Sequence, residues 1–301
     1  MPVITLANDY LTVQINPKGA EIRSVIDNKT GYEFMWQQEN NYWNRTAPVL
    51  FPIVGTLKDN TYYYKETAYQ LSRHRFARDL NFEVQTVTDN SATFYVKDGD
   101  GQEGTVDTLS SYPFEFSFQI SYVLYENQVT VTYELLNPSN DETIYYSVGG
   151  HPAFNVTTDE KGDFKEAAIV FEPSGPYLKY PLTKEGLLNR QDERYVPCDL
   201  RLLTRKDFRD DAWVFLTGEE TTAILKDYCE NVEIRMNWSR MPFFGVWTPF
   251  DQPAGFICLE PWAGVADVVD TDQQLINKYG IERLTPRNVA THDYTMTFTK
   301  K

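Results

Sequence analysis

The feature that most constrains the fold of this chain is a pair of alternating segments joined by a short turn. Residues 116–124 place apolar side chains at every second position, and residues 129–135 repeat the pattern after a turn at residues 126–128. A period of two gives each strand one apolar face and one polar face. Two such strands are typical of antiparallel sheets that pack into a sandwich. We therefore expect an all-β fold, namely a large antiparallel β-sandwich.

Other segments extend this expectation along the chain. The 20 tyrosines and 18 phenylalanines belong to residue types that are enriched in strands. One short helix is expected at residues 272–279, with Gly280 as its C-terminal stop. No internal repeat or linker is detected, so residues 1–301 are expected to form one domain. Further strands are predicted at residues 11–15, 21–26, 61–65, 81–87, 91–96, 143–148, 213–216, 231–238, 243–249 and 256–259.

The net charge limits which partners the protein can bind, and the cysteines indicate the compartment in which it works. A formal net charge of −15 argues against nucleic acid or an anionic membrane as partner, because both need a positive field. A neutral small molecule fits better. Cys198, Cys229 and Cys258 are widely spaced, which favours a reducing compartment over a disulfide framework. The chain begins without a signal-peptide pattern and contains no apolar run of spanning length, so a cytoplasmic protein is expected. The sequence leaves the oligomeric state open.

Two of the three histidines lie in turn-rich segments. His74 follows the apolar residues 48–55 and has three arginines close to it in an acidic chain. His151 follows two glycines, which permit unusual backbone torsions, and precedes a proline that fixes the exit direction of the chain. We interpret both as functional, although His74 fits equally well as a surface residue among arginines. His292, before the last alternating strand, is interpreted as structural.

Two carboxylates border apolar strands. Glu260 ends the expected strand at residues 256–259, where an isolated carboxylate is costly unless partners satisfy it. Asp211 precedes the strand at residues 213–216, and a solvated turn residue is its alternative interpretation. Trp36 and Trp43 are either walls of a cleft or packing aromatics. No Cys/His cluster is visible in the sequence, so neither a metal nor a cofactor is expected.

Four motifs together resemble the galactose mutarotases (aldose 1-epimerases), most closely their LacX-like branch. The similarity runs from about Thr5 to Thr299, and the motifs occur in the order of the family. The family fold is a large antiparallel β-sandwich with the sugar in a cleft on one sheet. The four motifs are residues 48–55, Arg73-His74-x-Phe76-Ala77-Arg78, Gly150-His151-Pro152-x-Phe154-Asn155 and Leu259-Glu260-Pro261-Trp262.

The resemblance implies roles for individual residues. Glu260 matches the catalytic base, His151 the catalytic acid, and His74 the histidine that holds the region of the sugar's ring oxygen. Asp211 is similar to the aspartate that binds sugar hydroxyls. Many relatives carry a sugar-binding arginine shortly after the first motif, whereas this chain has Lys58 close to that point, so Lys58 is expected to substitute for it or the contact is missing.

A second departure is Arg75, which stands where relatives often have glycine. Arg75 is a further candidate for binding the substrate, and so are Arg78 and Trp262, which lie in the second and fourth motifs. Arginines suit a phosphate group, because a guanidinium can donate two hydrogen bonds to it. Pairing with the abundant acidic residues is the alternative interpretation.

The chemistry that the family performs needs one proton acceptor and one proton donor. Interconverting the anomers of a hexose removes a proton from the anomeric hydroxyl, protonates the ring oxygen, and reverses both transfers after rotation. Burial should raise the pKa of Glu260, and a nearby carboxylate should hold a histidine protonated. The principal hypothesis is therefore an aldose 1-epimerase acting on a free hexose. The alternatives are a hexose-6-phosphate 1-epimerase and a non-catalytic carbohydrate-binding protein on the same scaffold.

Overall fold

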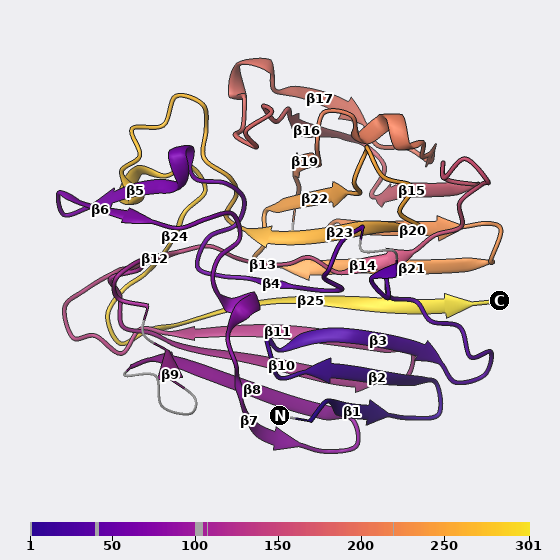
Figure 1. Cartoon of the computed structure of the whole chain (residues 1–301), viewed down its shortest axis with the longest axis horizontal. Coiled ribbons are helices and arrows are strands. Elements are labelled where there is room, and N and C mark those ends of the chain that lie inside the picture. The colour runs from indigo at the N-terminus through magenta and orange to yellow at the C-terminus, as the bar shows by residue number, and fades with distance from the viewer. Residues whose placement is uncertain (1, 40–41, 100–104, 107, 219) are drawn as a thin grey trace.

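The computed structural model of the chain describes residues 2–39, 42–99, 105–106, 108–218 and 220–301. Two large sheets, whose adjacent strands are antiparallel apart from the β8–β9 pair, lie face to face, which confirms the expected sandwich (Figure 1). The larger sheet has the strand order β18 (Arg201–Leu202), β15 (Ala167–Glu172), β20 (Thr222–Asp227), β21 (Val232–Ser239), β25 (Val289–Lys300), β11 (Gln128–Leu136), β10 (Ser117–Tyr125), β8 (Ser91–Asp98) and β7 (Glu83–Val87), with β9 (Thr105–Val106) beside β8.

The second large sheet carries the segments that matter for function. Its order is β17 (Arg194–Pro197), β16 (Pro176–Tyr180), β19 (Trp213–Leu216), β22 (Phe243–Trp247), β23 (Phe256–Ala263), β13 (Val148–Gly150) and β4 (Val49–Leu50), and β14 (Ala153–Asn155) also pairs with β23. Three small sheets complete the strands: β1 (Ile4–Ala7), β2 (Leu11–Asn16) and β3 (Glu21–Asp27); β5 (Thr61–Tyr64) and β6 (Thr67–Gln70); β12 (Ile144–Tyr146) and β24 (Glu282–Leu284).

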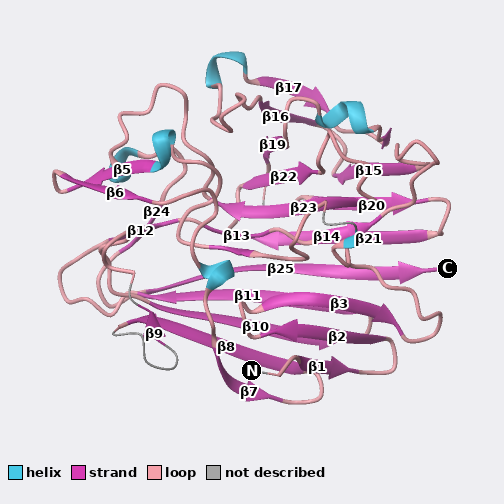
Figure 2. Cartoon of the chain, in the orientation of Figure 1, coloured by secondary structure: helices cyan, strands magenta, loops and turns pink. Residues whose placement is uncertain are grey.

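The described helices are all short 3₁₀ turns in the loops (Figure 2). The helix expected at residues 272–279 is wrong, because only Leu275–Asn277 forms a single turn there. None of the helices in the described ranges has the length and hydropathy needed to cross a membrane. The turns are η2 (Lys58–Asn60), η3 (Ala77–Asp79), η4 (Arg190–Asp192), η5 (Arg205–Phe208) and η6 (Leu275–Asn277).

Aromatic side chains fill the space between the two large sheets. Trp238 on β21 stacks on Phe244 of β22 with ring centroids 4.3 Å apart. Phe51, which follows β4, stacks on Phe118 of β10 at 4.5 Å. Stacked aromatic contacts of this kind add to the stabilisation from apolar burial. The residues that alternate on β10 and β11 point their buried side chains into this core.

Strand β23 differs from its expected bounds in a way that determines the site. It does not end at Glu260 but continues to Ala263, and all eight of its residues are buried. Ile257 and Leu259 belong to the core between the sheets. Because side chains alternate along a strand, Cys258 and Glu260 point to the opposite face. Glu260 is thus held in the middle of a rigid strand rather than at its end.

Candidate active site

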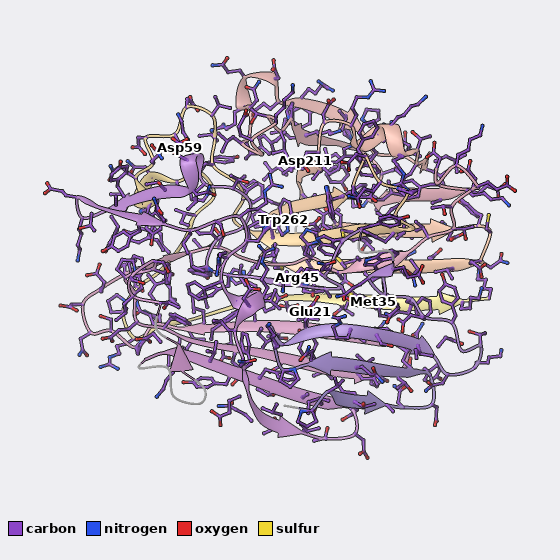
Figure 3. All side chains as sticks on the ribbon, in the orientation of Figure 1. Glu21, Met35, Arg45, Asp59, Asp211 and Trp262 are labelled. Atoms are coloured by element: carbon purple, nitrogen blue, oxygen red, sulfur yellow. The ribbon has the colours of Figure 1, made fainter. Side chains whose placement is uncertain are left out.

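A cavity of about 290 Å³ lies on the outer face of the second large sheet. Its walls combine residues from segments far apart in the sequence: Trp43, His74, His151, Asp211, Trp247 and Glu260. Figure 3 labels Asp211, which precedes β19, and Trp262, which lies on β23. The outer face of β23 therefore forms the floor of the cavity, and loops together with the neighbouring strands β19 and β22 form its walls.

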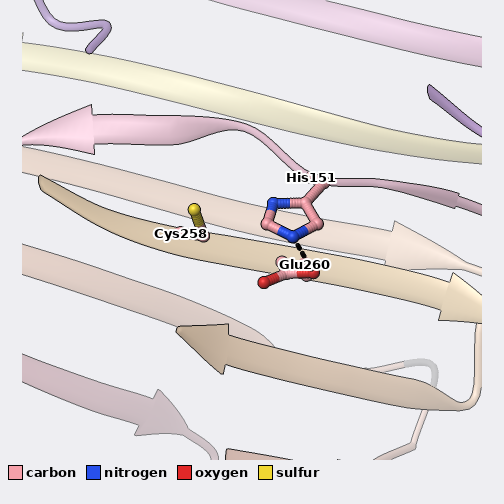
Figure 4. A group of neighbouring side chains, drawn as sticks. All are labelled: His151, Cys258 and Glu260. Carbon is pink, nitrogen blue, oxygen red and sulfur yellow. Dashed lines mark ion pairs between the residues drawn. The ribbon is translucent and has the colours of Figure 1, made fainter. Parts of the chain in front are cut away.

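Strand register brings His151 to Glu260. Gly149 on β13 pairs with Trp262, and Ala153 on β14 pairs with Cys258. His151 lies midway between the two paired segments, opposite Glu260. His151 Nε2 is 3.1 Å from Glu260 Oε2 (Figure 4). The two side chains form one buried pair, since His151 is 7% exposed and Glu260 is 1% exposed.

The two glycines before His151 are needed for space rather than for unusual torsions. Neither Gly149 nor Gly150 has a positive φ. A Cβ atom on Gly149 would lie 2.5 Å from Trp262 Cδ1, and one on Gly150 would lie 2.7 Å from the Tyr294 hydroxyl. The flat indole of Trp262 also covers Gly245 on β22. The absence of side chains at these positions therefore lets the cavity floor pack closely.

Burial dominates the electrostatics of the pair. It lowers the pKa of His151 to about 3, because an imidazolium loses its hydration inside the protein. Burial also raises the pKa of Glu260 well above its usual range; the nearby Asp211 raises it further, and Arg73 opposes the shift. The pKa of Glu260 is raised, as expected, whereas burial shifts the pKa of His151 in the direction opposite to that expected from a neighbouring carboxylate. The pair favours its neutral state, with the proton on the carboxyl.

His74 is fixed as a neutral hydrogen-bond donor. The backbone N–H of Gly55 donates to His74 Nδ1 at 3.1 Å, so the ring proton of the neutral imidazole lies on Nε2. Burial lowers the pKa of His74 well below its usual value, and His151, Arg78 and Arg73 act in the same direction. The His74 ring meets the His151 ring edge-on at 5.6 Å. Its Nε2–H is thus available to a ligand.

Asp211 and Arg73 form the polar side of the cavity. Arg73 Nη2 is 3.5 Å from Asp211 Oδ2, and Arg73 Nε donates to Thr56 Oγ1 at 2.7 Å. Thr56 directly follows Gly55, near the point where the family resemblance predicts a sugar-binding arginine. The guanidinium of Arg73 therefore reaches this region from the neighbouring motif.

The other predicted substrate-binding residues divide into two groups. Arg78 and Trp262 line the cavity. Lys58 does not: its ammonium donates to the carbonyl of Val269 at 3.1 Å, and the adjacent Asp59 lies near the β5–β6 hairpin in Figure 3. Arg75 is exposed and is also absent from the cavity lining. These two placements correct the sequence prediction, which could not tell where the loop side chains point.

Aromatic residues of the cavity lining contact the imidazole of His151. Trp43 stacks on it with ring centroids 5.0 Å apart, and Trp247 meets it edge-on at 5.8 Å. Trp36 lies deeper, against Phe256. The wall interpretation thus holds for Trp43 and the packing interpretation for Trp36. Sequence reasoning missed Trp247, whose position next to the site depends on the β22–β23 pairing.

A buried ion pair holds the rim of the cavity. Lys278 Nζ lies 3.1 Å from Asp267 Oδ1, with both side chains 3% exposed. Lys278 also donates to the carbonyl of Val265 at 2.5 Å, and Asp267 Oδ2 accepts the backbone N–H of Lys58 at 2.9 Å. Val265 lines the cavity. The pair thus ties the loop after β23 to the segment that follows the first motif.

These features define a β-sandwich protein of the galactose mutarotase type. A galactose mutarotase related enzyme from Lactobacillus acidophilus has a TM-score of 0.92 and 34% identity, with coverage of 99% of this chain and 98% of that one. A galactose mutarotase-like protein from Lactobacillus casei has a TM-score of 0.91 and 26% identity, with coverage of 99% and 100%.

Sequence comparison gives the family. The family model for aldose 1-epimerase matches residues 2–274. The chain belongs to the aldose 1-epimerase family. The plasmid form of protein LacX from Lactococcus lactis subsp. lactis is 27% identical over 307 residues, which cover 98% of each chain. This likeness confirms the resemblance to the LacX-like branch.

Proposed function

We propose that the protein is an aldose 1-epimerase that interconverts the α and β anomers of a free hexose. The observation that carries this proposal is the buried His151–Glu260 pair, with 3.1 Å between Nε2 and Oε2, at a cavity on the outer face of the sheet. Anomer interconversion needs a proton acceptor and a proton donor within reach of two oxygens bonded to the same carbon. A pair in direct contact satisfies that requirement.

In the proposed reaction, the carboxylate of Glu260 accepts the proton of the anomeric hydroxyl. The imidazolium of His151 donates a proton to the ring oxygen, and the bond between that oxygen and the anomeric carbon breaks. Rotation of the aldehyde and reversal of both transfers give the other anomer. His74 Nε2–H donates to the sugar near its ring oxygen, and Asp211 accepts hydrogen bonds from sugar hydroxyls.

The pair reaches this charged form by an internal proton transfer. Burial lowers the pKa of His151 and raises the pKa of Glu260, so it favours the form of the pair with the proton on Glu260. A bound sugar brings hydroxyl groups that hydrogen-bond to the charged forms. The proton then moves across the 3.1 Å contact from carboxyl to imidazole, and no proton needs to enter from solvent.

The direct test follows the optical rotation of freshly dissolved α-glucose and α-galactose. We expect the protein to accelerate the approach to the equilibrium rotation far beyond the spontaneous rate in the same buffer. A rate equal to the spontaneous one with both sugars contradicts the proposal. Sugar binding in a calorimeter without any acceleration identifies a carbohydrate-binding protein instead.

Arg73 is expected to bind the neutral hexose. Its guanidinium lies beside Asp211 and Thr56 at the cavity, where Lys58 does not reach. Hydrogen bonds from charged groups contribute about 1.5–3 kcal/mol. Arg73→Met should therefore raise KM about tenfold with a smaller effect on kcat. Arg75→Met is the matched control, because Arg75 lies two residues away and outside the cavity lining, and we expect it to behave like the wild type.

The same two variants test the phosphate alternative, which Arg73 and Arg78 in the cavity lining favour. kcat/KM is measured on glucose and on glucose 6-phosphate. We expect no preference for the phosphate, since Arg73 is already paired with Asp211. A wild-type preference for glucose 6-phosphate that disappears in Arg73→Met would identify a hexose-6-phosphate 1-epimerase.

A further inference from the structure

The outer face of β23 brings together three residues whose side chains are common metal ligands. Cys258 and Glu260 are two positions apart on β23 and point to the same face, and His151 lies opposite them. One ring nitrogen of His151, Cys258 Sγ and one carboxylate oxygen of Glu260 all lie within 4.8 Å of one another (Figure 4). The sequence analysis expected no such cluster, because the three residues meet only through the pairing of β23 with β13 and β14.

The protonation of the pair determines which ring nitrogen of His151 can bind a metal ion. His151 Nδ1 is buried and has no hydrogen-bond partner among the residues that the structure describes. Buried polar atoms normally have a partner. Because the carboxyl of Glu260 faces Nε2 at 3.1 Å and carries the shared proton, the ring proton lies on Nδ1, and Nε2 is the nitrogen whose lone pair can bind a metal ion.

We propose that His151, Cys258 and Glu260 bind one Zn²⁺ ion, and that this ion inhibits the enzyme. A thiolate, an imidazole and a carboxylate are the ligand types that zinc accepts in tetrahedral sites. Metal–ligand bonds of about 2.0–2.3 Å place tetrahedral ligand atoms roughly 3.5 Å apart. The three side chains thus need to move by about an ångström from separations of up to 4.8 Å.

The position of the ion explains the inhibition. A metal ion held by His151 and Glu260 occupies both groups that move protons in the proposed function, so the inhibitory effect rests on that function. Cys258 is fully buried, whereas His151 and Glu260 line the cavity. The ion must therefore enter through the cavity, and a bound sugar should block its entry. Binding releases the thiol proton and the proton shared by the pair.

Metal binding is tested separately from activity. Metal-free protein is titrated with Co²⁺ while absorbance is recorded, and with Zn²⁺ in a calorimeter. We expect one ion per chain and a thiolate-to-cobalt charge-transfer band in the near ultraviolet. Cys258→Ala should lose the band. Its affinity for Zn²⁺ should fall by more than roughly 100-fold, because substitution of a residue that only supports a metal ligand typically costs about 10–100-fold. Galactose should slow the binding of either ion.

Two other free cysteines provide matched controls. Cys198 and Cys229 lie outside the cluster, so Cys198→Ala and Cys229→Ala should keep the cobalt band. In polarimetric assays Zn²⁺ should inhibit the wild type and both control variants. Cys258→Ala should have the same rate with Zn²⁺ as without it. Cys258→Ser serves as a second variant, with circular dichroism confirming that each variant is folded.

The failures of the two proposals are distinguishable. Absence of the cobalt band in the wild type, or an unchanged band in Cys258→Ala, overturns the zinc site whatever the activity. A wild type that accelerates no sugar but shows the Cys258-dependent band retains the metal site and loses the epimerase assignment.

Discussion

Glu260→Gln is expected to reduce the accelerated rate of anomer interconversion by roughly 10²–10⁴-fold, the typical contribution of a positioned proton-transfer group. The amide has nearly the shape of the carboxyl and can still hydrogen-bond to His151, but it cannot accept the proton of the anomeric hydroxyl. The loss should appear in kcat, with KM changed little. Polarimetry of fresh α-galactose measures both parameters.

A half-buried carboxyl elsewhere in the chain controls for general effects of the substitution. Glu282 lies in β24, outside the cavity lining, and burial raises its pKa as well. Glu282→Gln should therefore keep the wild-type rate. If Glu260→Gln retained a rate within a few-fold of the wild type while its circular dichroism was unchanged, Glu260 would not be the base.

Lys278→Met is expected to lower the free energy of unfolding by about 3–5 kcal/mol, because removal of one partner leaves a buried charge without compensation. The charge left behind is Asp267, which keeps only the N–H of Lys58 as a hydrogen-bond donor to its carboxylate among the described residues. The loss is measured from the midpoint and slope of urea unfolding. Since the pair anchors the loop that carries Val265, KM should rise as well.

Two further variants distinguish the effect of breaking the buried Lys278–Asp267 pair from the effect of removing any lysine. Lys226 Nζ is 3.4 Å from Glu233 on the surface, with both side chains about one-third exposed. Lys226→Met should cost less than about 1 kcal/mol. Adding Asp267→Asn to Lys278→Met removes the unpaired charge and should recover part of the stability. If Lys278→Met and Lys226→Met lowered the free energy of unfolding equally, the buried pair would contribute no more to stability than the surface pair.

The fold was predictable wherever one face of a strand is solvated. β10 and β11 show strict alternation, and both form close to their expected bounds. Residues 165–205 carry little alternation, and the short strands β17 and β18, which formed there unpredicted, are largely exposed. β23 is covered on both faces, so its first charged residue was mistaken for its end. Periodicity cannot mark the limits of a strand that has no polar face.

Only those site residues that stand out in local sequence motifs could be predicted. Glu260, His151, His74 and Asp211 stood out by residue type and local setting, and all four line one cavity. The direction of a loop side chain depends on contacts with distant segments, so Lys58 and Arg75 were misplaced and Trp247 and Cys258 were missed. The protonation of His151 was misjudged because the sequence gives no measure of burial.

The order of strands in the larger sheet has a consequence for synthesis on the ribosome. β25, the last strand of the chain, lies between β11 and β21 and pairs along its length with both. The halves on either side can join only after residues 289–300 have left the exit tunnel. Chains that stop short of Val289 would expose two long unpaired edges, which are prone to aggregate. Folding should therefore be slow, as topologies dominated by distant pairings generally are.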